Sequence, residues 1–121
     1  MSFGQRTING LLSSRQAATD LLRKEGTRTR NLTLDEAFVL QGATHLLTDR
    51  EKIFGYEVAR LVGISRNTTY NILNRFEEED RILEGEWEIR KIASEEGRPL
   101  RRLYTPTGFG HDVLELFKPK N

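Results

Sequence analysis

The residues best suited to chemistry in this sequence are uncharged amides. Asn67, Asn71 and Asn74 fall on one face of a helix predicted over 65–80, with Tyr70 on its flank. Asparagine is a mediocre helix former, so a purely solvated face would more often carry lysine, glutamate or glutamine. Its amide both donates and accepts, and it can pair bidentately with adenine in the major groove of DNA. The pattern indicates base reading, although an ordinary amphipathic helix with a polar exterior explains the same residues without any function.

The predicted helix has a polarity that limits how it could meet DNA. Ser65 is a good N-cap, and an acidic run at 77–80 crowds the other end. Phosphates would repel that run, so only the N-terminal half, led by Arg66 and favoured by the helix dipole, could approach a polyanion. The opposite face is apolar at helical spacing, and we expect it to be buried: Thr69, Ile72, Leu73 and Phe76.

The flanking sequence predicts the elements that hold this helix in place. A shorter helix over 54–61 precedes it, and Gly63 can take the left-handed conformation that ends a helix. A short helix, a three-residue turn with glycine and a serine-capped longer helix together form the pattern of a helix-turn-helix. Any tight helical corner can produce the same pattern.

A β-hairpin is predicted directly after the helix pair. Residues 84–92 alternate as a half-buried strand with Trp87 and Ile89 on one face, 94–99 form a polar loop, and 100–105 return as the second strand. Such a wing suits contact with phosphates or a minor groove, unless its cations are routine solvated ones. Its cations are Arg90, Lys91, Arg98, Arg101 and Arg102.

Three more helices are predicted. Thr33 and Glu36 form a capping box that starts a helix running to about Leu47. A short helix over 107–117 follows the hairpin. The helix over 7–25 carries an apolar stripe with no obvious use inside a compact domain, which favours a contact with a second copy or partner over packing on its own domain or a mobile arm. The residues assigned to dimerisation are Ile8, Leu11, Leu12, Leu21, Leu22, Leu114 and Phe117.

Composition bounds the class of protein. The 121 residues suffice for one small domain, without cysteine, a membrane-spanning stretch or a signal-peptide pattern. Residues 1–31 hold six basic and two acidic side chains, and the basic segment 27–31 could lie along a phosphate backbone or be a solvated linker. Residues 32–121 hold thirteen basic and sixteen acidic side chains, so a DNA-binding surface requires segregated charge. No catalytic, metal or cofactor motif is recognisable, and we expect a cytoplasmic, nucleoid-associated protein that is not an enzyme.

Taken together, these motifs resemble the PadR-like winged-helix transcriptional regulators. Residues 54–59 (FGYEVA) look like that family's G-Y-E-[IV]-A helix, and 65–79 match its S-R-x-T-x-Y-x-x-L-x-R-[LF]-E-E-E recognition helix. Gly97-Arg98-Pro99 and the arginines, tyrosine, threonine and glycine that follow resemble its wing. The match covers about 34–110. The resemblance implies a dimeric DNA-binding regulator, usually a repressor.

The sequence departs from that family at points that matter for function. Asn67 and Asn71 stand where the family commonly has glycine and proline, so its target sequence cannot be transferred. Only some ten residues follow Gly108, where the family usually continues into a dimerisation helix, a role that the N-terminal helix could take over. A small-molecule effector is neither indicated nor excluded.

The sequence thus predicts an α+β protein, mainly α with a small hairpin: an N-terminal helix and linker (1–31) and a winged helix-turn-helix domain (32–121). We expect a dimeric repressor that binds duplex DNA. The alternatives are a protein that coats DNA for architectural, plasmid or phage maintenance purposes, and a winged-helix module for protein interaction. The residues assigned to DNA are Ser65, Arg66, Asn67, Thr68, Tyr70, Asn71, Asn74, Arg75, Arg90, Lys91, Arg98, Arg101 and Arg102.

Overall fold

The computed structural model describes residues 8–119 and has the predicted α+β class. Six helices accompany one three-stranded antiparallel sheet of order β1-β3-β2. None of the helices in the described range is long and apolar enough to cross a membrane. The elements are α1 (Ile8–Glu25), α2 (Leu34–Leu46), β1 (Ile53–Phe54), α3 (Gly55–Val62), α4 (Arg66–Glu78), β2 (Leu83–Trp87), α5 (Arg90–Glu95), β3 (Arg102–Pro106) and α6 (Gly108–Glu115).

The predicted helix ends are confirmed. The Thr33 hydroxyl accepts a hydrogen bond from the Glu36 N–H, and the Glu36 carboxylate accepts one from the Thr33 N–H, which completes the capping box of α2. Ser65 caps α4 by accepting from the Thr68 N–H. Gly63 takes the left-handed conformation (φ 81°) at the end of α3, where a side chain would be strained. These local signals fix the α3–α4 corner.

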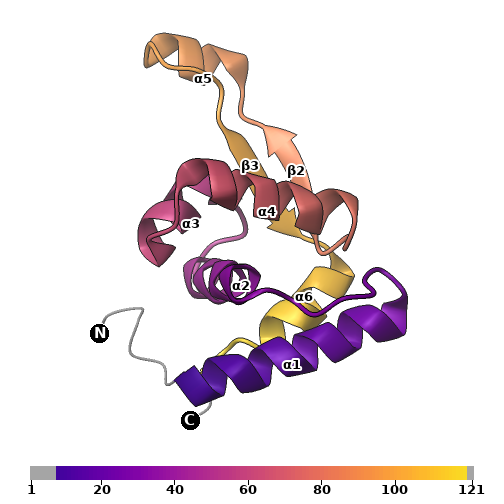
Figure 1. Cartoon of the computed structure of the whole chain (residues 1–121). Helices are drawn as coiled ribbons and strands as arrows, with labels where there is room; N and C mark the ends of the chain where they lie inside the picture. Colours follow the sequence, from indigo (N-terminus) through magenta and orange to yellow (C-terminus); the bar gives the residue numbers. More distant parts are fainter. Residues whose placement is uncertain (1–7, 120–121) are drawn as a thin grey trace.

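Helix α1 packs on its own chain, which corrects the expectation that its apolar stripe lacks a use inside the domain. Figure 1 shows α1 lying along the side of the molecule formed by α2 and α6. Leu11, Ala18 and Leu22 are buried in the core that the rest of the chain forms. The stripe is covered because its buried side chains belong to the same core cluster as those of α2 and α6.

The residues assigned to dimerisation are therefore mostly unavailable for it. Leu11, Leu22, Leu114 and Phe117 are all at most 5 % exposed, and Leu21 is half-buried against the same core. Leu12 is exposed, and the side chain of Ile8 lies outside the described part of the chain. These side chains stabilise the monomer, so a dimer interface has to be sought elsewhere.

The segment predicted as a basic linker contains a buried ion cluster. Arg28 is 7 % exposed and donates to both oxygens of Glu36, at 2.9 and 2.8 Å. Its Nε and Nη2 also donate to Asp80, at 3.2 and 2.7 Å. Arg28 is thus not a phosphate ligand. It joins the chain before α2 to Asp80, two residues beyond the end of α4, a contact between positions 52 residues apart in the sequence.

The sheet carries a hairpin that extends beyond the helical body (Figure 1). Strand β3 pairs with β1 through Ile53↔Tyr104 and with β2 through Gly85↔Tyr104, so Tyr104 lies at its centre and is fully buried. The strand predicted to reach Ile92 ends at Trp87. Trp87 and Ile89 are 60 % and 68 % exposed, because none of the described elements covers the hairpin there.

A short helix replaces the end of the predicted strand and the start of the predicted loop. Ile89, Ile92 and Ala93 have the spacing of one helical face, and α5 covers Arg90–Glu95 at the far end of the hairpin. Gly97 ends α5 in the left-handed conformation (φ 65°), with the Arg98 N–H donating to the Ala93 carbonyl. The alternation up to Ile89 was mistaken for a strand that continues.

Candidate nucleic-acid interface

The N-terminal half of α4 presents a polar surface with free hydrogen-bonding groups. Arg66, Asn67 and Asn71 are exposed. Within residues 8–119, the amides of Asn67 and Asn71 have no hydrogen-bond partner, and Arg66 forms no ion pair. Ser65 and Thr68 are bonded to each other at the N-terminus, so their hydroxyls order the cap. Asn67 and Asn71 lie one turn apart and can face one ligand together.

A cation–aromatic cluster joins the start of α4 to the residue before strand β3. Two guanidinium groups lie near the Tyr56 ring, with Arg66 6.0 Å and Arg101 4.6 Å from its centroid. Arg101 also lies 5.7 Å from the ring of Phe54, and its Nη1 donates to the Tyr56 hydroxyl at 3.5 Å. Stacking fixes these guanidinium groups without neutralising them, in contrast to an ion pair with a carboxylate. Arg66 and Arg101 were assigned to DNA from the sequence, but Tyr56 and the grouping were not predicted, because the three residues come from α4, the segment before β3 and α3.

Asn74 and Tyr70 face the hairpin, which corrects their assignment to the same surface as Asn67 and Asn71. The Tyr104 hydroxyl donates to Asn74 Oδ1 at 2.7 Å, and burial raises the pKa of Tyr104 to about 12, so the phenol stays a donor. Tyr70 is half-buried against Gly55, where a Cβ would lie 2.4 Å from the ring. Both residues line a groove between α4 and the hairpin, whereas Asn67 and Asn71 are exposed to solvent.

Three of the arginines assigned to DNA are held by carboxylates, and two of them, Arg75 and Arg98, lie outside the groove between α4 and the hairpin. Arg75 pairs with Glu36 and Glu79, each at 3.4 Å, on the side of α4 that faces α2. Arg98 pairs with Glu88 and Glu96 and lies at the base of α5. The Arg98 guanidinium holds the pKa of Glu88 below its ordinary value. Both arginines therefore shape the fold in the free protein, and phosphate contact by either would first require an ion pair to open.

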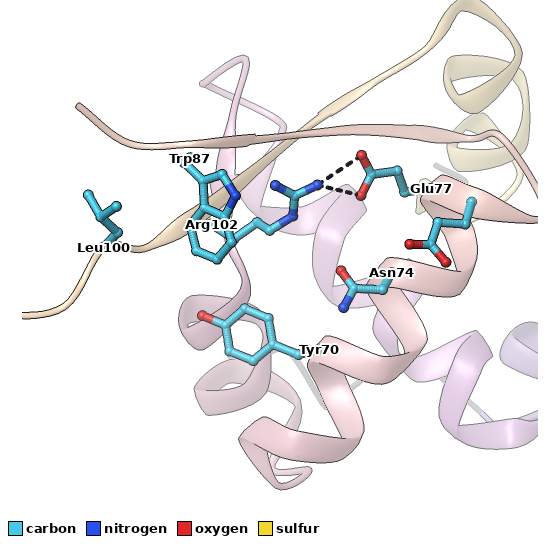
Figure 2. Close-up of a pocket in the computed structure, with 7 residues that line it drawn as sticks. Tyr70, Asn74, Glu77, Trp87, Leu100 and Arg102 are labelled. Carbon is cyan, nitrogen blue, oxygen red and sulfur yellow. Dashed lines mark hydrogen bonds and ion pairs between the residues drawn. The ribbon is translucent and has the colours of Figure 1, made fainter. Parts of the chain in front are cut away.

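A groove separates α4 from the hairpin (Figure 2). Arg102 lies in it, with the Trp87 ring 5.2 Å from its guanidinium carbon and both oxygens of Glu77 within 3.0 Å of Nη2. Trp87 and Arg102 are opposite each other across the β2–β3 pair, which explains the stacking. The lining residues are Tyr70, Asn74, Glu77, Glu78, Trp87, Leu100 and Arg102.

The remaining cations of the predicted wing lie on α5. Arg90 and Lys91 are exposed, and neither takes part in an ion pair among the residues that the structure describes. The sequence predicted them on the first strand of the hairpin. They lie instead on α5, at the far end of the hairpin from α4 (Figure 1).

The acidic end of α4 is less repulsive than its sequence suggested. Asp80 is 1 % exposed and bonded to Arg28, and Glu77 is bonded to Arg102 and to the Gly85 N–H. Glu78 and Glu79 remain exposed. The described residues contain no group of three or more His, Asp or Glu placed to hold a metal ion. The surface with free groups is therefore the start of α4 together with Tyr56 and Arg101.

Comparisons with protein-family models, curated proteins and solved structures gave no match. The likeness to the PadR-like regulators thus stands on the motifs quoted from the sequence.

Proposed function

We propose that the chain is a winged-helix regulator that binds duplex DNA, with the start of α4 in the major groove and the β2–β3 hairpin as the wing. One observation carries the proposal. Asn67 and Asn71 are exposed and without partners in the described structure, next to two cations, Arg66 and Arg101, that are fixed on an aromatic ring but not neutralised. Sequence-specific DNA binding needs side chains that hydrogen-bond to base edges and cations that contact phosphates, and this surface has both.

The charge distribution supports the same orientation. Arg66 lies in the first turn of α4, where the helix dipole also favours an anion. The acidic residues lie at the other end of the helix, and two of them are neutralised by Arg28 and Arg102. DNA approaching along the α4 N-terminus therefore meets positive potential in a chain whose net charge is only +1.

The direct test is a fluorescence-anisotropy titration of the chain against random duplex DNA at two salt concentrations, with its mass in solution measured in parallel. A DNA-binding regulator loses affinity steeply as salt rises, because phosphate contacts release counterions. A dimer would place two α4 helices at half-sites about 34–36 Å apart. Absence of binding at low salt would exclude the proposal for this chain.

Asn71 is expected to carry sequence discrimination. After an operator has been selected from a random library, Asn71→Ala should cost about 1–3 kcal/mol on that operator and relax the preference at one base position. Binding to random DNA should stay unchanged, because the amide carries no charge. Equal losses on operator and random DNA would contradict the assignment. Asn74→Ala is not a matched control, since Asn74 accepts the bond from Tyr104.

A second candidate function is a protein-interaction module. It is favoured by the apolar side chains on the protruding hairpin, where Trp87, Ile89 and Ile92 are each at least 45 % exposed. Such side chains on an extension of the fold are typical of protein contacts. A chain that serves only as a scaffold would show little salt-dependent affinity for random DNA, so the same titration separates the two functions.

A further inference from the structure

The groove between α4 and the hairpin is spanned by one ion pair. Arg102 Nη2 donates to Glu77 Oε1 at 2.9 Å and to Oε2 at 3.0 Å, and each side chain is 22 % exposed. Figure 2 shows the pair bridging the helix and the hairpin beside Trp87. Because the pair is reachable from solvent, an anion that enters the groove can compete with Glu77 for the guanidinium.

The sequence of β2 makes room for this pair. At Gly85, a Cβ would lie 2.5 Å from Arg102 Nη2 and 2.6 Å from Glu77 Oε1. The Gly85 N–H donates to Glu77 Oε2 at 2.9 Å. Glu77 therefore has a second donor, and its carboxylate would keep a partner on the hairpin if Arg102 turned to another anion.

Arg102 is also held independently of Glu77. Its guanidinium carbon lies 5.2 Å from the centroid of Trp87 and 5.9 Å from that of Tyr104. Stacking on these rings positions the cation whichever anion it binds. A phosphate offers the same bidentate geometry to a guanidinium as a carboxylate does.

We propose that this groove is a subsite for one phosphate of the DNA backbone and that Glu77 occupies it in the free protein. Glu77 acts as an internal competitor: DNA that binds along α4 displaces its carboxylate from Arg102. The second acidic residue of the lining, Glu78, opposes a further phosphate, so the subsite takes one. The inference rests on the proposed DNA binding and adds a residue that restrains it.

The test compares Glu77→Gln with Glu78→Gln by anisotropy titration against random duplex DNA at low salt. Both variants remove one negative charge from adjacent positions of the same groove, but only Glu77 is bonded to Arg102. The glutamine carbonyl at 77 can still accept from the Gly85 N–H. Glu77→Gln should bind roughly tenfold more tightly than Glu78→Gln, the effect of freeing one charge-assisted contact.

A double-mutant cycle assigns the gain to Arg102. In the Arg102→Gln background, Glu77→Gln and Glu78→Gln should have the same affinity, because the guanidinium that Glu77 restrains is absent. Equal effects of the two variants with Arg102 present would overturn the inference and leave the DNA-binding function standing. Weaker binding by Glu77→Gln would assign Glu77 a structural role and also overturn it. No binding by any of the proteins would reject both the function and the subsite.

Discussion

Arg28→Ala is expected to lower the free energy of unfolding by about 3–5 kcal/mol, a large part of the stability of a domain this small. The substitution leaves Glu36 and Asp80 charged and buried, each 1 % exposed, after removing four hydrogen bonds from one guanidinium. Asp80 then loses the bonds from Arg28, and Glu36 keeps the Thr33 N–H and the longer, 3.4 Å pair with Arg75, so both carboxylates have to be hydrated by opening the contact between α2 and the end of α4. Denaturant unfolding followed by circular dichroism measures the change.

Arg30→Ala is the matched control. It removes the same charge two residues along the same segment, and Arg30 is exposed and unpaired within the described residues. Arg30→Ala should change the free energy of unfolding by no more than about 0.5 kcal/mol. The combined change of Arg28→Met, Glu36→Gln and Asp80→Asn removes all three charges and should recover part of the loss. If Arg28→Ala lowered the free energy of unfolding by less than about 1 kcal/mol, the ion cluster would be hydrated in solution and the prediction would be wrong.

The same cluster predicts how stability changes with pH. Burial by itself would raise the pKa of Glu36, but hydrogen bonds from Arg28 and Thr33 and the charge of Arg28 outweigh it and lower the pKa. A carboxyl with a lowered pKa in the folded state stabilises the fold above its ordinary pKa, and this contribution is lost as the pH falls through the folded value. Between neutral and acidic pH, the free energy of unfolding of Glu36→Gln should therefore fall less than that of the natural chain. Denaturant unfolding at a series of pH values measures both. An equal fall in the free energy of unfolding of the two proteins would contradict this role of Glu36.

Local signals predicted most of the fold. Caps at Thr33 and Ser65 and the left-handed Gly63 are properties of a few consecutive residues, so the helices and the α3–α4 corner could be placed from the sequence. Burial of the α1 stripe could not, because it depends on the surface that α2 and α6 leave uncovered. The hairpin end was mispredicted for a related reason. Alternation continues through Ile89, although β2 ends at Trp87 and α5 begins at Arg90.

The candidate site was predicted by residue type but not by partner. Charge and spacing singled out Asn67, Asn71 and Arg66; among residues 8–119 the two amides have no hydrogen-bond partner and Arg66 forms no ion pair. The same criteria also chose Asn74, Arg98 and Arg102, whose partners Tyr104, Glu88 and Glu77 are 10 to 30 residues away in the sequence. Whether an arginine is free or paired is a property of the tertiary structure. A charge count along the chain therefore overstates the cations that can meet a phosphate.

Replacing Arg66 and Arg101 together by glutamine is expected to have the largest effect on DNA binding. The two cations lie near the Tyr56 ring and are not paired with carboxylates in the described structure, so each can neutralise one phosphate. Removing two phosphate contacts should make the slope of log affinity against log salt concentration less negative by about 1.8. Near 50 mM salt, this change corresponds to binding that is weaker by roughly 100-fold. Titrations of random duplex DNA over a salt series measure both quantities.

Lys24→Gln with Lys118→Gln is the matched control for net charge. Lys24 is exposed on α1, and Lys118 forms an exposed pair with Glu115 beyond α6, so both lie away from the start of α4. This variant should keep the slope of the natural chain, because long-range charge is screened beyond about 10 Å at 0.1 M salt. If both double variants flattened the slope equally, DNA binding would depend on overall charge. A change confined to Arg66 and Arg101 would place the phosphates at the start of α4, where Asn67 and Asn71 can reach the bases between them.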